Sequence, residues 1–173
     1  MMSKPTCPCC SGELSREEYD KHVRDSIRRH GRFLQGVFAT KDDPGPAFTY
    51  TIGNWENHQL PELLVIGTSR GTYLNELSKM MIARGRKFRD GEIFRGKDID
   101  ERAINDLVQI KIIDADPIVE EYFTCGAGTA PVQQVILSDL EGRLPGDPEC
   151  DEKFAGMPIC DEKLTWLRTF ADD

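Results

Sequence analysis

Two neighbouring stretches decide the fold: residues 47–53, AFTYTIG, and residues 62–66, ELLVI. In the first, the bulky side chains of Phe48, Tyr50 and Ile52 alternate with threonines, which is the period of a strand. The second is almost entirely apolar, which is typical of a strand covered on both faces of a sheet. We therefore expect a sheet with residues 62–66 near its centre.

Further strands and helices are predicted on both sides of these stretches. Ser15 and Glu18 form a capping-box pattern, and Gly31 suits a helix end, so a helix is expected over residues 16–30. A second helix is expected to begin near Ser69 or Thr72 and to end at Gly85, and a third helix to cover residues 116–125. Five strands are expected, over residues 33–39, 47–52, 62–66, 108–113 and 132–137. Such runs favour an α+β fold: a single domain with one mixed or mainly antiparallel sheet, two to four helices and an extended C-terminal tail.

The chain of 173 residues suits one domain, and its composition divides it into three parts. Residues 1–14 form a Cys-rich lead, residues 15–144 the α+β core domain, and residues 145–173 an acidic tail with Pro and Gly that is expected to pack on the core. No apolar stretch has the length of a membrane span, and residues 1–7 lack the apolar region of a secretory signal. The sequence therefore predicts a cytoplasmic protein that does not enter membranes.

The charge is unevenly distributed. The formal net charge is -8, and residues 103–173 hold 5 Lys and Arg against 15 Asp and Glu. A nucleic-acid-binding protein needs clustered cations to neutralise phosphates, so this composition argues against a nucleic-acid partner. An acidic half of this kind can instead steer the protein to a basic protein partner.

Several segments follow one another along the chain in a recognisable order. They are the Cys7-x-x-Cys10 lead, Ile27-x-x-His30-Gly31, the Thr-Tyr-Thr-Ile-Gly strand with the later Pro-Glu-Leu, Asp139-x-x-Gly142-Arg143-x-Pro145, and Gly156-Met157-Pro158-Ile159. Together they resemble DUF4262, an uncharacterised bacterial domain family. The chain departs from the family pattern in two places: Arg32 and Phe33 follow His30-Gly31 where the family often has Trp, and Gly146 follows Pro145 where the family tends to have Trp. The resemblance implies no established reaction, so the function has to be argued from the residues.

The cysteines offer one candidate metal site. Cys7 and Cys10 have the spacing of a zinc knuckle, and Cys150 and Cys160 of the tail are the candidates to complete a tetrahedral site. Two alternatives remain open, namely reduced thiols without metal and a redox pair. Zinc is thus one candidate cofactor.

The end of the strand over residues 47–52 and the loop after it form the candidate ligand site. A glycine at the strand end permits close approach of a ligand, and the loop brings hydrogen-bonding and stacking groups. An ordinary strand end followed by a polar loop is the alternative. The candidate ligand-binding residues are Tyr50, Thr51, Gly53, Asn54 and Trp55.

Three side chains are candidates for catalysis. His30 ends the first helix, where the helix dipole favours a protonated imidazole, although it is equally suited to capping that helix. His58 lies in the candidate ligand loop, and histidine is the side chain that changes charge near neutral pH. Glu62 begins an apolar strand, where a carboxylate needs a partner; Arg84, Arg86 or His30 is expected to provide a structural ion pair unless Glu62 acts as a base or ligand contact.

Together these features predict a protein that binds a polar or anionic small molecule, in a pocket between residues 50–58 and His30. The sequence leaves open whether the protein is an enzyme. The alternatives are a protein-interaction, regulatory or immunity-type factor acting through the acidic C-terminal half, and a zinc-stabilised structural domain. A flavin is a weaker candidate cofactor, suggested only because the strand over residues 47–53 faintly resembles strands of flavin-binding split barrels.

Overall fold

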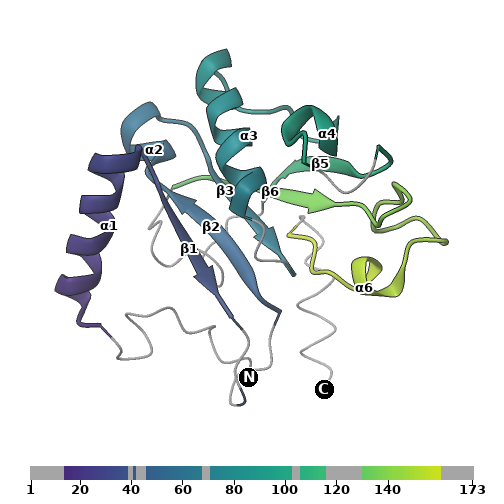
Figure 1. Cartoon of the computed structure of the whole chain (residues 1–173), viewed down its shortest axis with the longest axis horizontal. Helices are drawn as coiled ribbons and strands as arrows, with labels where there is room; N and C mark the ends of the chain where they lie inside the picture. Colours follow the sequence, from purple (N-terminus) through teal and green to yellow (C-terminus); the bar gives the residue numbers. More distant parts are fainter. Residues whose placement is uncertain are drawn as a thin grey trace.

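The computed structural model describes residues 14–38, 41, 46–67, 71–102, 106–115 and 130–160. Within these residues one six-stranded sheet has the order β1-β2-β3-β6-β5-β4 (Figure 1). Neighbouring strands are antiparallel except β3 and β6, which are parallel, so the expected mixed, mainly antiparallel sheet is confirmed. The strands are β1 (Phe33–Val37), β2 (Phe48–Ile52), β3 (Glu62–Ile66), β4 (Glu92–Arg95), β5 (Gln109–Asp114) and β6 (Val132–Leu137).

Five helices accompany the sheet in the described part of the chain, and only two of them are long. The predicted α+β fold class is therefore confirmed. No helix among the described residues is long and apolar enough to cross a membrane. The helices are α1 (Arg16–His30), α2 (Asn54–His58), α3 (Gly71–Arg84), α4 (Gly96–Ile99) and α6 (Glu152–Ala155).

The first long helix is determined by local sequence. The Glu18 N–H donates to Ser15 Oγ at 3.1 Å, and the Ser15 N–H donates to the Glu18 carboxylate at 2.9 Å, so the predicted capping box is present. Gly31 ends the helix with a φ of 84°, in the left-handed region that glycine adopts at low cost. The predicted bounds of this helix are confirmed.

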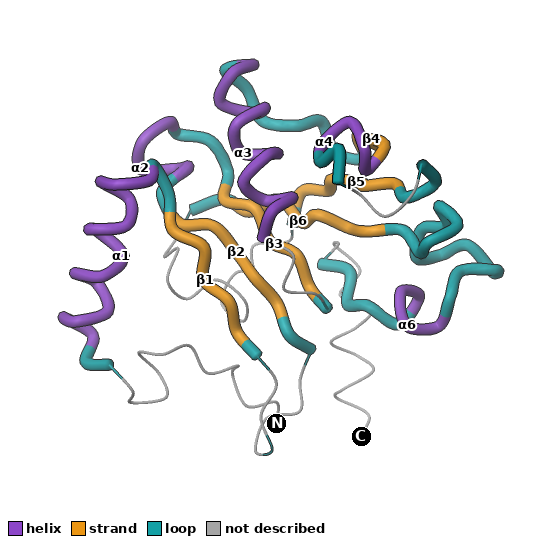
Figure 2. The backbone as a smooth tube through the Cα atoms, viewed as in Figure 1, coloured by secondary structure: helices purple, strands orange, loops and turns teal. Residues whose placement is uncertain are grey.

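The two long helices cover opposite faces of the sheet. Alternate residues of β3 divide between two cores: Leu64 joins the core under α1, and Leu63 joins the core under α3. Figure 2 shows α3 in front of the sheet and α1 beside β1. All five residues of β3 are buried, as predicted for a central strand. The same is true of β2, so neither of these strands has a solvent-facing side.

One predicted segment differs from the structure, and another lies outside the described residues. Residues 53–60 were expected to form a polar loop, but they contain the short helix α2. The reason is tertiary, because the carboxylate that caps this helix comes from the next strand. The helix expected over residues 116–125 lies outside the described residues, as does the Cys-rich lead up to residue 13.

The part of the tail that the structure describes, residues 145–160, returns to the sheet after α6. Met157 lies directly over Gly67, where it occupies the space that a Cβ would need. Gln134 of β6 donates from Nε2 to the Pro158 carbonyl oxygen at 2.8 Å and accepts the Cys160 N–H at 2.7 Å. A buried side chain of the central sheet therefore holds this segment in place.

Candidate functional site

Glu62 is the centre of a buried polar network at the end of the β2–β3 pair. Its side chain is only 1% exposed. Oε1 accepts the N–H groups of Gly53 at 3.0 Å and Trp55 at 2.9 Å, while Oε2 accepts the Thr51 hydroxyl at 2.6 Å. Since Gly53 and Trp55 begin α2, the carboxylate of β3 caps that helix.

Burial is the largest influence on Glu62, and it raises the pKa of the carboxyl group above its ordinary value. The hydrogen bonds from Thr51 and from the backbone at Trp55 and Gly53 oppose this rise, because they stabilise the charged form. None of the three expected partners, Arg84, Arg86 and His30, forms an ion pair with Glu62 in the described part of the chain. Arg84 instead pairs with Glu92 at 3.0 Å, because the end of α3 lies beside β4.

A second layer of the network joins the site to α3. Asn54 is fully buried and donates from Nδ2 to Ser78 Oγ at 2.9 Å. Thr51 Oγ1 accepts the Leu63 N–H at 2.9 Å, in addition to donating to Glu62. These contacts connect the end of β2 and the start of α2 to β3 and α3, and the side chains of Thr51, Asn54, Glu62 and Ser78 are all buried.

Arg32 extends this network towards the surface. Its Nε donates to Asn54 Oδ1 at 3.4 Å, and its Nη1 donates to Asn75 Oδ1 at 3.4 Å. Loss of solvent around the partly buried guanidinium lowers the pKa of Arg32, while the charges of Glu62 and Glu76 act to raise it. Arg32 makes no ion pair with any residue that the structure describes.

Arg32 also lines an open cavity of about 580 Å³ between the end of α1, the start of β1 and α3, hereafter the Arg32 cavity. Its walls are rich in polar and basic side chains. Those used below are His30, Asn75, Glu76, Lys79 and Arg102.

The structure brings some of the predicted site residues together and separates others. Thr51, Gly53, Asn54, Trp55 and Glu62 belong to one network, whereas His30 lies at the Arg32 cavity. Two further predicted residues lie elsewhere: Tyr50 is 1% exposed in the core under α1, where its ring stacks with Phe48, and His58 is exposed at the end of α2. Sequence reasoning did not single out Asn75 or Ser78. Arg32 entered it only as the end of a basic run over residues 24–32, for which a solvated face and an anion or phosphate pocket were the two interpretations.

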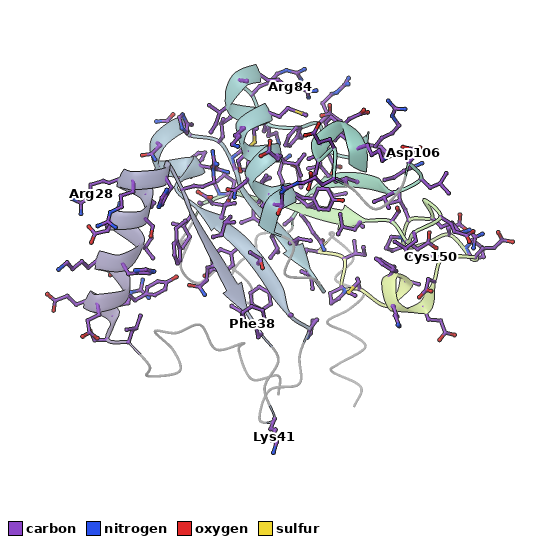
Figure 3. All side chains as sticks on the ribbon, viewed as in Figure 1. Arg28, Phe38, Lys41, Arg84, Asp106 and Cys150 are labelled. Atoms are coloured by element: carbon purple, nitrogen blue, oxygen red, sulfur yellow. The ribbon has the colours of Figure 1, made fainter. Side chains whose placement is uncertain are left out.

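The two described candidate metal ligands lie in different surroundings. Cys150 is buried, donates to the Arg143 carbonyl oxygen at 3.3 Å and lies at the end of the molecule opposite Arg28 of α1 (Figure 3). Burial and the nearby carboxylates, Asp139 first, raise the pKa of the Cys150 thiol. Cys160 is fully buried in the core under α1.

Among residues 14–160, with the gaps given above, no group of three or more Cys, His, Asp or Glu side chains is arranged to hold a metal ion. Cys7 and Cys10 lie outside the described residues. The zinc site therefore stays a prediction.

The raised pKa of Glu62 predicts a specific pH dependence of stability. A folded-state pKa above the unfolded value favours the protonated folded protein, so this contribution is complete at low pH and is lost as the pH rises through the folded pKa. We expect the stability of wild type relative to Glu62→Gln to rise as the pH falls from neutrality towards about 4.3, the ordinary pKa of glutamate. Urea unfolding across this range measures it, with the exposed Glu56→Gln as the matched control; a constant difference would contradict the prediction.

Comparison with known proteins gives one match. The family model described as "Domain of unknown function (DUF4262)" matches residues 26–151. This range includes the whole sheet, the Glu62 network and all the residues named above at the Arg32 cavity. No curated protein and no solved structure gives a significant match to the chain.

Proposed function

Because the chain belongs to the DUF4262 family, whose function is unknown, its activity has to be inferred from its own residues, and we propose that it binds a small anionic molecule in the Arg32 cavity. The ligand would present a carboxylate or a phosphate group. A cavity of about 580 Å³ has the size of ordinary small-molecule sites.

The observation that carries this proposal is the state of Arg32. Its guanidinium is partly removed from water, yet its two hydrogen bonds, both 3.4 Å long, go to neutral amide oxygens. A partly buried cation is stabilised when an anion pairs with it, and a guanidinium can donate to both oxygens of a carboxylate or phosphate. Asn54 and Asn75 would hold Arg32 ready for such a ligand.

The other charges around the cavity support an anionic ligand. Lys79 pairs with Glu76 at 3.0 Å, and Arg102 pairs with Asp100 at 3.2 Å, so Arg32 is the cation of this wall that lacks a carboxylate partner among the described residues. His30 adds a further nitrogen donor at the rim. The whole chain has a net charge of -8, so this group of basic side chains differs from the acidic character of the rest of the protein.

The burial and hydrogen bonds of Glu62 favour a binding function over a catalytic one. Both of its oxygens accept hydrogen bonds from the protein itself, and its side chain is 1% exposed. A general base has to come within hydrogen-bond reach of the proton that it removes. The network therefore serves to position Asn54, and through it Arg32, as part of a binding site.

Isothermal titration calorimetry at constant ionic strength would test the proposal with inorganic phosphate, succinate and citrate as probes. We expect at least one probe to bind the wild-type protein and Arg32→Gln to weaken that binding by about tenfold or more, since a charge-assisted hydrogen bond contributes about 1.5–3 kcal/mol. Arg28→Gln removes the same charge from the exposed face of α1 and should change little. The proposal fails if no probe binds, or if both variants lose affinity equally.

A further inference from the structure

A second cavity, of about 430 Å³, lies between the end of α2 and the β5–β6 pair, and we call it the Gln133 cavity. Its walls are mainly apolar and include Leu60, Pro61 and Val132. The polar side chains of Lys87 and Asp114 also face it. Apolar walls with a few fixed polar groups are typical of ligand sites, and nothing in the anion-binding proposal uses this cavity.

Gln133 of β6 is the unusual residue of this cavity, because it is 1% exposed and only half satisfied. Its Nε2 donates to the Phe88 carbonyl oxygen at 2.9 Å and to Asp114 Oδ1 at 2.8 Å, so both amide hydrogens are used. Its Oε1 is buried and accepts no hydrogen bond from any described residue. Exchanging the oxygen and nitrogen would set the carbonyl against two acceptors, so the orientation is fixed.

Asp114 supplies a second acceptor. Lys87 Nζ lies 3.3 Å from Oδ1 and 3.2 Å from Oδ2, and Gln133 also donates to Oδ1. A carboxylate offers about four acceptor positions, so one remains after these three contacts. The Lys87 charge cancels that of Asp114, which disfavours both an ammonium group and an anion here and favours a neutral N–H donor.

Trp55 gives the cavity a flat wall. Its side chain is 44% exposed although the residue follows the fully buried Asn54. Its backbone N–H is held by Glu62, which fixes the start of α2. An exposed indole on a rigid element can stack with a planar ring, and stacking on an aromatic side chain is a common way to bind heteroaromatic bases.

From this geometry we propose that the Gln133 cavity binds a neutral, planar heteroaromatic ring that carries an amino group. The ring stacks on Trp55 and packs against Leu60, Pro61 and Val132. The amino group donates to the acceptor position that Asp114 leaves open. It reaches Gln133 Oε1 when the side chains that cover this buried oxygen move aside. The two proposed sites thus bind different chemical groups: the Arg32 cavity binds an anion, and the Gln133 cavity binds a neutral heteroaromatic ring.

The test uses fluorescence, with adenosine and cytidine as probes. The chain has two tryptophans, so Trp166→Phe leaves Trp55 as the only one. We expect adenosine or cytidine to quench Trp55 fluorescence to saturation. N6,N6-dimethyladenosine, which lacks the amino hydrogens, should bind at least about tenfold more weakly than adenosine, because the buried acceptor is then left unpaired. Absence of quenching by both nucleosides, or equal binding of the dimethylated analogue, would overturn the proposal.

Substitutions test whether nucleosides bind in the Gln133 cavity or elsewhere on the protein. Trp55→Ala should abolish nucleoside binding in calorimetry, whereas Phe38→Ala, which removes an exposed aromatic ring after β1, should leave it unchanged. Gln133→Met should remove the preference for adenosine over its dimethylated analogue. If this variant does not fold, Trp55→Ala still shows whether nucleosides bind in this cavity. Arg32→Gln should not alter nucleoside binding, so failure here is distinguishable from failure of the anion site. Equal loss in Trp55→Ala and Phe38→Ala would contradict the assignment.

Discussion

Replacing Glu62 with leucine should lower the free energy of unfolding by about 3–5 kcal/mol. The change leaves three donors without an acceptor: the N–H groups of Gly53 and Trp55 and the hydroxyl of Thr51. Each buried donor that loses its partner costs about 1–3 kcal/mol, and the favourable burial of leucine offsets part of the sum. The expected loss is large because one carboxylate serves a strand end, a helix start and a side chain together.

Urea unfolding at neutral pH would measure this loss, and two variants define its cause. Glu62→Gln keeps an acceptor oxygen for the backbone N–H groups, so it should lose less than half as much. Glu56→Leu makes the same substitution on the exposed face of α2 and should stay within about 0.5 kcal/mol of wild type. A loss below about 1 kcal/mol in Glu62→Leu would show that the network does not hold α2.

The same network explains which parts of the site the sequence could predict. The pattern at residues 62–66 is local, so the central strand could be predicted from it, and the anomaly of a carboxylate at its start was visible. The partners of Glu62 were not visible, because two of them are backbone N–H groups. Backbone donors carry no sequence signature, so the sequence suggested Arg84, Arg86 or His30 as partner instead, and Arg84 pairs with Glu92.

The helix α2 was missed for the same reason. Gly53 stands at its N-cap and has no side chain to cap it, so the usual start signal is absent. The capping group arrives from Glu62, in a strand that follows the helix. The sequence did not show that Arg32 joins this network, because its contacts come from Asn54 and Asn75, which lie on two separate helices.

Tyr50 shows a limit of reading alternation in a strand. The alternation of residues 48–52 was correct, and Phe48, Tyr50 and Ile52 share one core. Tyr50 was included in the candidate ligand site because it lies near the strand end that precedes Gly53. Both faces of β2 are covered, however, by α1 on one side and α3 on the other, and the location of those helices is a property of the whole fold.

Replacing Gly142 with alanine should lower the free energy of unfolding by about 3–4 kcal/mol. A Cβ at this position would lie 2.5 Å from the Leu107 carbonyl oxygen, a backbone atom that cannot turn aside. The φ of Gly142 is also 84°, where a residue with a Cβ pays about 1–2 kcal/mol. The rest of the loss comes from moving the turn after β6 away from the strand end that it covers, which is the cost of overpacking.

Gly91 provides a matched control, because its φ is also 84° and no atom lies within 4 Å of its would-be Cβ. Gly91→Ala should therefore show the backbone cost alone, about 1–2 kcal/mol, and the difference between the two variants measures the contact with Leu107. Urea midpoints at equal slope give both values. Losses that agree within about 0.5 kcal/mol would mean that the turn shifts freely.

The Gly142 result bears on the family pattern Asp139-x-x-Gly142-Arg143. Asp139 is 4% exposed, and its carboxylate accepts the N–H groups of Glu141 at 3.0 Å, Arg143 at 2.8 Å and Asp151 at 3.0 Å. These bonds close the turn and attach the start of the tail to it, and the turn fits only if residue 142 has no Cβ. A larger loss for Gly142→Ala than for Gly91→Ala would therefore assign this motif to the architecture of the domain, and leave the Arg32 and Gln133 cavities as the places to look for ligands.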